Sequence, residues 1–224
     1  MRSLSMLSDM EGDAKNEAPL GGDMPPPGGV RRWRKEQTRR ALLEAARAVL
    51  ARRGLAGLTT REVAAEAGVA VGTFFVHFPD LDTLIETLLD ERIAAALETA
   101  FATLPETDDP VDRLVHVARK LYESYDSEPD LSRHYLSASL FHTNPHGPAE
   151  RRMAEFREWV TRCLTQAEAA GTSAPVDPVL AFTGYFSLYF GILVAGLRGQ
   201  LDRAAQLRLL EDSLRRLLTT EGPA

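Results

Sequence analysis

The chain has 224 residues, of which 44% are apolar and 26% charged, a mixture typical of soluble globular proteins. Its net charge of −6 excludes a uniformly basic nucleic-acid-binding protein, but it is compatible with a locally basic segment. Cys163 is the single cysteine, so an internal disulfide and a four-cysteine metal site are both excluded. One cysteine also suits a reducing cytoplasm.

Charge is unevenly distributed over the first 61 residues. Residues 1–30 include the Pro/Gly-rich stretch 18–30, and we expect them to form a disordered tail without a secretory signal. Residues 31–61 carry ten arginine or lysine residues and two glutamates, a net charge of +8. This block is a candidate contact surface for a polyanion, and a solvated arginine-rich helix face is the alternative.

Helix start and stop signals divide the segment before residue 80 into three helices. Thr59 and Glu62 have the spacing of a capping box, in which a threonine hydroxyl accepts a backbone N–H three residues ahead. Gly68 permits a tight turn directly after the short helix that this box begins. The expected helices are 36–53, 60–67 and 70–77.

The remaining chain is predicted to be helical as well. Asp80 caps a long helix, and two Asp-Pro pairs, at 109–110 and 177–178, each combine an N-cap with a first-turn proline. Residues 179–197 carry no charge and reach the length of a membrane span, but their glycines and hydroxyl residues favour a helix buried in a domain or subunit interface. The further expected helices are 110–127, 130–143, 147–170, 178–198 and 203–219.

No segment has strand periodicity, so the predicted fold class is all-α.

Residues 59–78 read TTREVAAEAGVAVGTFFVHF. This pattern predicts two helices of two turns each joined by Ala-Gly-Val, which is helix-turn-helix geometry. Small alanines allow the helices to pack closely, and Val63, Val69, Phe74 and Phe78 can fill a small core. Over about 36–90 the sequence resembles the TetR family of one-component transcriptional regulators.

The resemblance implies a three-helix DNA-binding domain over 31–80 and a helical ligand-binding and dimerisation bundle over 81–224. It implies that Thr60 and Arg61 face phosphates, and that an arm from Arg31 to Arg40 reaches the DNA backbone or the adjacent minor groove. The residues implied to contact DNA are Arg31, Arg32, Arg34, Arg39, Thr60, Arg61, Ala70, Val71, Gly72, Thr73, Phe75, Val76 and His77.

The sequence departs from the family pattern at the presumed DNA surface of the second short helix. Ala70 replaces the usual capping Ser or Thr, Phe75 replaces a Tyr, and Leu81 stands where a Lys is common. Residues 62–91 contain no Lys or Arg and seven acidic residues, so an arginine contact to guanine is excluded there. We therefore expect affinity to come mainly from the arginine arm and Arg61, with Val71, Thr73 and Val76 giving apolar and shape readout.

The C-terminal region offers candidates for an interface and a pocket. Small residues recur along one face of 179–197, which allows close approach of another helix from a second copy or from the same chain. The interface candidates are Gly184, Ser187, Gly191, Ala195, Leu207 and Leu214. Side chains with apolar bodies and polar tips suit a small-molecule pocket, although each also suits an ordinary core. The pocket candidates are Tyr122, Tyr125, His134, Tyr135, Phe141, His142, Trp159, Cys163, Gln166, Phe182, Tyr185, Phe186 and Tyr189.

No nucleophile-elbow, P-loop, dinucleotide-binding or zinc-protease motif occurs, so we expect no enzyme activity, no cofactor and no metal. The expected function is that of a cytoplasmic, DNA-binding transcriptional regulator. It is expected to bind a pseudo-palindromic operator as a homodimer, to respond to a small-molecule effector and to need no membrane. The alternative is a helical small-molecule-binding dimer with weakened or lost DNA binding, which the absence of basic residues over 62–91 suggests.

Overall fold

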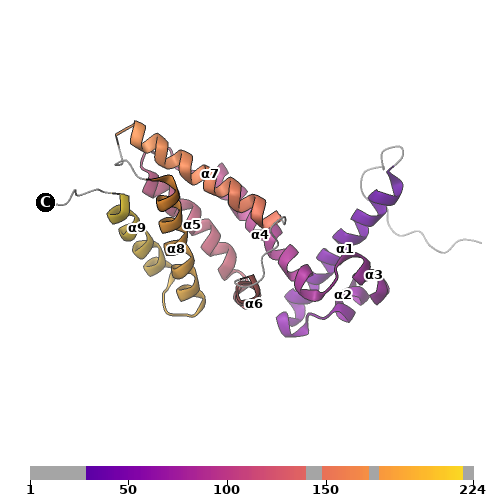
Figure 1. Ribbon diagram of the computed structural model, residues 1–224. Coiled ribbons are helices and arrows are strands. Elements are labelled where there is room, and N and C mark those ends of the chain that lie inside the picture. Colours follow the sequence, from indigo (N-terminus) through magenta and orange to yellow (C-terminus); the bar gives the residue numbers. More distant parts are fainter. Residues whose placement is uncertain (1–28, 140–147, 172–176, 219–224) are drawn as a thin grey trace, which may run out of the picture. The chain divides into compact units, whose positions relative to one another are not determined.

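The computed structural model describes residues 29–139, 148–171 and 177–218, and within these ranges every regular element is a helix (Figure 1). The prediction of an all-α fold is therefore confirmed, and most helix ends lie within a few residues of the expected ones. The helices are α1 Val30–Arg53, the 3-10 turn η1 Leu55–Gly57, α2 Thr60–Glu66, α3 Val71–His77, α4 Leu81–Ala102, α5 Pro110–Asp126, α6 Pro129–Ser139, α7 Pro148–Ala169, α8 Pro178–Leu197 and α9 Arg203–Leu218.

Helix α1 begins at Val30, six residues before its expected start. Four of the six missed residues are Arg or Lys, and Val30 and Trp33 alone are too few to show the apolar periodicity on which the prediction depended. The chain divides into two compact units, and the boundary falls inside α1 between Arg40 and Ala41. In the first unit, Arg40 lies 3.8 Å from Glu36 one turn earlier, and the Thr38 hydroxyl donates to the Arg34 carbonyl. The tail predicted for 1–30 lies almost wholly outside the described residues.

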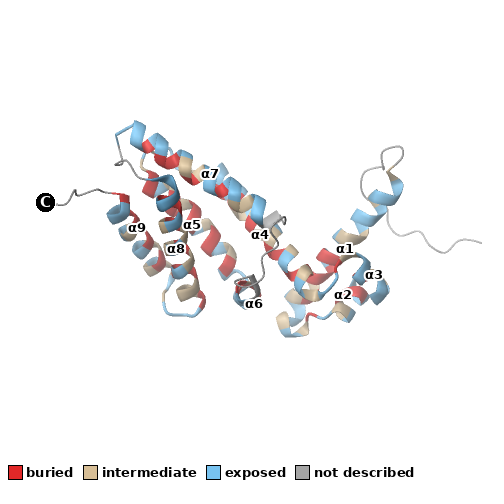
Figure 2. Cartoon of the chain, in the orientation of Figure 1, coloured by how far each residue is buried: buried red, intermediate tan, exposed pale blue. Residues whose placement is uncertain are grey.

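A small core forms where the later half of α1 meets α2, α3 and the first turns of α4 (Figure 2). Val63, Phe74 and Phe78 are buried in it, as the helix-turn-helix prediction requires. Val69 packs against it from the turn. Two phenylalanine rings are large anchors for such short helices, and their burial fixes which face of α3 points outward.

A larger core lies between the end of α4 and helices α5, α7, α8 and α9. The uncharged α8 is long and apolar enough to span a membrane by length and composition. One face of it, including Phe182, Tyr185 and Tyr189, is buried in this core, while Val179 and Leu180 are exposed. The expectation of a buried helix is thus met on one face of α8. The opposite face is exposed to solvent in the single chain.

Buried polar groups in the larger core donate to backbone carbonyls. The Tyr122 hydroxyl donates to the Tyr189 carbonyl at 2.9 Å, and Gln206 Nε2 donates to the Ile192 carbonyl at 3.1 Å. A buried polar atom without a partner costs about 1–3 kcal/mol, so these bonds remove a penalty that the core would otherwise carry. They also link α5 to α8 and α8 to α9.

Candidate nucleic-acid interface

The α2–α3 turn has the local geometry that its sequence predicts. Thr59 Oγ1 accepts the Glu62 backbone N–H at 3.1 Å, and Gly68 adopts a positive φ of 68° that ends α2. The Val69 N–H then donates to the Ala64 carbonyl at 3.0 Å, which closes the turn. Ala70 stands at the N-cap of α3 without a side-chain hydrogen bond, as expected for a residue without a polar side chain.

Helix α3 has one buried face and one exposed face. Phe74 is 0% exposed, whereas Val71, Phe75 and Val76 are 40%, 51% and 68% exposed. The Phe75 ring meets the Phe74 ring edge-on, with centroids 5.4 Å apart, so it packs partly on the core and remains half open to solvent. Gly72 is also exposed. The predicted recognition helix is therefore anchored by Phe74 and displays its other side.

Several arginines of the basic segment are paired with carboxylates in the folded chain. Arg52 meets Glu66 with two hydrogen bonds, of 3.0 and 2.5 Å, and Arg53 Nη1 lies 2.7 Å from Glu62. Arg47 pairs with Glu91 of α4. The hydrogen bond to Glu66 raises the pKa of Arg52, and the same bond lowers the pKa of Glu66. These pairs offset part of the charge that the sequence places on residues 31–61.

The other predicted phosphate contacts are mostly exposed. Arg61 is exposed at the start of α2 and Thr60 is half-buried beside it. In the first unit Arg31, Arg32 and Arg34 are exposed. Arg39 is half-buried and takes part in an interaction of its own. On α3, Ala70 is exposed while Thr73 and His77 are half-buried.

Comparison with known proteins finds a family whose model matches this region. Residues 42–88 match the family model described as bacterial regulatory proteins, tetR family, and the match covers α2, α3 and the parts of α1 and α4 that form their core. Residues 42–88 are thus similar to the N-terminal helix-turn-helix domain of tetR-family regulators. A DNA-binding transcription regulator with a helix-turn-helix is therefore the general function of the chain.

Similar solved structures extend the likeness to the whole fold. RolR in complex with resorcinol is 20% identical with a TM-score of 0.64, covering 85% of this chain and 92% of its own. A TetR transcriptional regulator from Rhodococcus sp. RHA1 is 22% identical with a TM-score of 0.58, covering 79% and 95%. The fatty acid degradation regulator FadR from Bacillus halodurans is 15% identical with a TM-score of 0.58, covering 79% and 94%. These likenesses confirm the fold, including the helical C-terminal part.

Most pocket candidates are brought together in the larger core. The rings of Tyr122 and Tyr189 stack with centroids 5.2 Å apart, and Phe156, which the sequence did not single out, lies 6.0 Å from Tyr185. Burial raises the pKa of the Cys163 thiol, which keeps it protonated at neutral pH. The buried candidates are Tyr122, Tyr125, Cys163, Phe182, Tyr185 and Tyr189.

The other pocket candidates are not part of that buried group. Gln166 lies on the exposed side of α7. His134 Nε2 lies 3.1 Å from Asp82 Oδ1 of α4. Tyr135, Trp159 and Phe186 are half-buried at the edge of the core. Phe141 and His142 lie outside the described residues.

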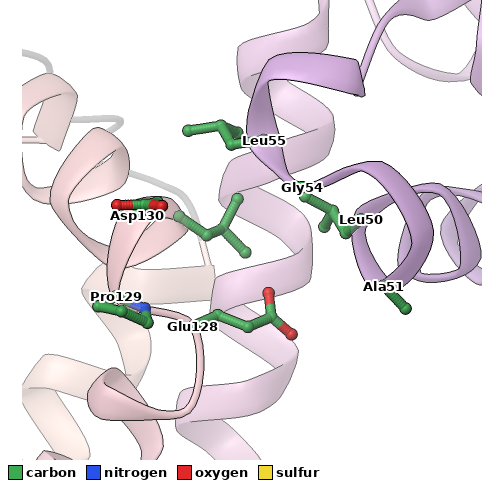
Figure 3. A pocket seen from close by; sticks show the side chains of 8 residues that line it. Leu50, Ala51, Gly54, Leu55, Glu128, Pro129 and Asp130 are labelled. Carbon is green, nitrogen blue, oxygen red and sulfur yellow. The ribbon is translucent and has the colours of Figure 1, made fainter.

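Two cavities that the sequence did not indicate lie where α1 and η1 approach the start of α6. One, of about 170 Å³, is bounded by Leu50, Leu55 and Leu131 among others (Figure 3). Its neighbour, of about 300 Å³, extends toward Arg47 and Arg92. None of the predicted pocket residues lines either cavity. Their walls come from helices far apart in sequence, so no local pattern could have indicated them.

The interface candidates divide between the surface and the chain's own core. Ser187 and Gly191 are exposed on α8, and Gly184, Ala195 and Leu207 are half-buried. Leu214 is buried in the larger core. A Cβ at Gly184 would lie 3.0 Å from the Leu217 side chain of α9, so the small residue there already serves packing within the chain.

Proposed function

We propose that the chain is a homodimeric, ligand-responsive repressor that binds a pseudo-palindromic operator through α2 and α3. The observation that supports this proposal most directly is that α3 has one buried and one exposed face. Phe74 is completely buried, while Val76 is 68% exposed. A helix held by one face and open on the other can enter the major groove of B-DNA. The α3 segment facing the bases would comprise Ala70, Val71, Gly72, Thr73, Phe75, Val76 and His77.

The phosphate contacts would come from arginines that form no ion pair with a carboxylate of α2 or α4. Arg47, Arg52 and Arg53 already meet carboxylates. We therefore assign the electrostatic part of DNA affinity to Arg61, beside Thr60, and to the N-terminal arginines. The latter are Arg31, Arg32, Arg34 and Arg39.

The C-terminal bundle of a cytoplasmic, non-enzymatic dimer would hold the effector and the second copy. The exposed face of α8, with Ser187 and Gly191, together with α9 would form the subunit contact in a four-helix arrangement. The effector would bind among the aromatic side chains of the larger core. That the chain has a small-molecule effector is supported by RolR, a protein of similar fold that was solved in complex with resorcinol. It would shift the population of dimers whose recognition helices match successive major grooves, about 34 Å apart.

A gel shift with the DNA upstream of the chain's own gene tests the proposal, with binding expected at low salt. Deleting residues 1–35 should flatten the dependence of binding on salt, because each phosphate contact contributes about 0.9 to the slope of log K against log salt. An unchanged slope would reject the arginine arm while leaving DNA binding intact.

The alternative function is a helical small-molecule-binding dimer that has lost DNA binding. The observation that favours it is the pairing of Arg52 and Arg53 with Glu66 and Glu62, beside an α3 without Arg or Lys. A folded dimer that shifts no duplex at low salt, including duplexes selected from a random library, would establish this alternative.

A further inference from the structure

The outward face of α3 is apolar at the place where a DNA-reading helix contacts base edges. Val71 and Phe75 lie one helical turn apart, and Val76 is the most exposed of the large apolar side chains on α3. Gly72 lies on the same side, and a Cβ added there would meet no atom within 4 Å. In the described part of the chain this face remains open to solvent, so it is available to an external surface.

Polar readout of bases is sparse on this face. Residues 62–91 contain no Arg or Lys, which recognise guanine, and no Asn or Gln, which recognise adenine. On α3 itself the polar side chains are Thr73 and His77, and both are half-buried. A specific major-groove contact from α3 must therefore depend largely on apolar groups.

One apolar group is presented by a base in the major groove, the C5-methyl of thymine. We propose that Val71, Phe75 and Val76 recognise thymine methyl groups in each operator half-site. This inference rests on the proposed DNA-binding function and specifies what the recognition helix reads. Removing one methyl group from water between such side chains changes affinity by about fourfold.

The methyl contact and the phosphate contacts differ in their dependence on salt. Contacts from Arg61 and the N-terminal arginines weaken as salt rises, because releasing each DNA counterion into solution is less favourable when the salt concentration there is already high. An apolar contact to a methyl group involves no charge. The ratio of affinities for a duplex with and without the methyl group is therefore expected to stay constant while both affinities fall.

Replacing thymine by deoxyuridine tests this directly, because uracil lacks only the C5-methyl and keeps its hydrogen-bonding groups. The full chain would first select a duplex from a random 30-base-pair library at low salt. Thymines of the selected duplex would then be replaced by deoxyuridine one at a time, and Kd measured by fluorescence anisotropy. We expect about fourfold weaker binding for each methyl contacted by α3 and no change for thymines in the flanks.

Two variants assign the effect to α3. The triple variant V71A/F75A/V76A changes only exposed positions, and circular dichroism would verify its fold; it should bind thymine and deoxyuridine duplexes equally. The conservative variant Val76→Ile should keep the preference for thymine. Equal binding of both duplexes by the unaltered chain, or a preference that survives in the triple variant, would overturn the inference. Failure to select any duplex would instead reject DNA binding itself, and the methyl readout with it.

Discussion

Helix α4 contributes to two cores, and these cores are built in different ways. Around its first turns a small core is anchored by Phe74 and Phe78 from segments close together in sequence. Around its last turns a larger core stacks aromatic rings such as Tyr122 and Tyr189, which are 67 residues apart. The small core thus comes mostly from residues 42–89, with Leu131 of α6 added, whereas the large one joins residues spread from Ile93 to Leu218.

The largest expected effect on stability is a difference between substitutions of two neighbouring phenylalanines of α3. Phe74→Ala should reduce the free energy of unfolding by about 3–5 kcal/mol, because Phe74 is 0% exposed and its removal leaves a cavity in the small core. Phe75→Ala should cost less than about 1 kcal/mol, since that ring is half exposed. Urea unfolding followed by circular dichroism measures both. Similar losses for the two variants would mean that α3 is not divided into a buried and an open face.

The next effect tests how tightly the large core is packed where α8 meets α9. A Cβ at Gly196 would lie 1.9 Å from Gln206 Nε2, and this buried amide donates to the Ile192 carbonyl. Gly196→Ala should therefore cost about 1–3 kcal/mol, because the amide must move and its buried hydrogen bond is lost.

A double-mutant cycle isolates that contact. Gln206→Ala removes the atom that the new methyl group meets, so Gly196→Ala should cost much less in the Gln206→Ala background than alone. Strict additivity of the two losses in urea unfolding would show that the glycine is not needed for the approach of Gln206.

The contrast between the two cores also explains how much could be predicted from sequence. The helix-turn-helix could be placed almost residue by residue, because Thr59 and Gly68 act through hydrogen bonds and turn geometry within one or two turns. The exposure of Gln166 could not be predicted, since it depends on the rotation of α7 against α5 and α8. The cavities beside Leu131 are also formed by segments distant in sequence.

The electrostatics of the candidate site were only partly predictable. A count of residues 31–61 gives their net charge, but it does not show that Glu66 of α2 and Glu91 of α4 lie against Arg52 and Arg47. The early start of α1 was missed for a related reason. Four of its first six residues are Arg or Lys, so too few apolar positions mark its start in a hydrophobic pattern.

A smaller effect concerns the cap at the point where α4 begins. The Thr83 backbone N–H donates to Asp80 Oδ1 at 2.7 Å, and this bond, with a second from the Thr83 hydroxyl, lowers the pKa of Asp80. Asp80→Ala should cost about 1 kcal/mol, the usual value of an N-cap. Because the folded pKa lies below the unfolded one, the charge-dependent part of this stability is complete at neutral pH and is lost as the pH falls through the folded pKa.

Asp80→Asn is the matched control for the titration. Asparagine caps nearly as well but does not titrate, so this variant should retain most of the stability at pH 7 and lose less of it on acidification. Urea unfolding at several pH values between neutral and about 3 makes the comparison. A variant that loses stability with acid as steeply as the unaltered chain would show that the Asp80 carboxylate is not the responsible group.

The smallest change in stability, and the most informative for binding, is expected from the exposed ion pairs of α2. The double variant Glu62→Gln/Glu66→Gln should leave urea unfolding nearly unchanged, because exposed pairs contribute little. It should nevertheless tighten DNA binding and steepen its salt dependence by up to about 0.9 for each phosphate that Arg52 or Arg53 then contacts.

Glu98→Gln, which removes one exposed carboxylate from the far part of α4, is the control. Because the control removes one carboxylate and the variant two, a control gain about half that of the variant, in the logarithm of the affinity, would mean that only net charge matters. A gain confined to the α2 variant would show that ion pairs with the α2 carboxylates prevent Arg52 and Arg53 from contacting DNA phosphates.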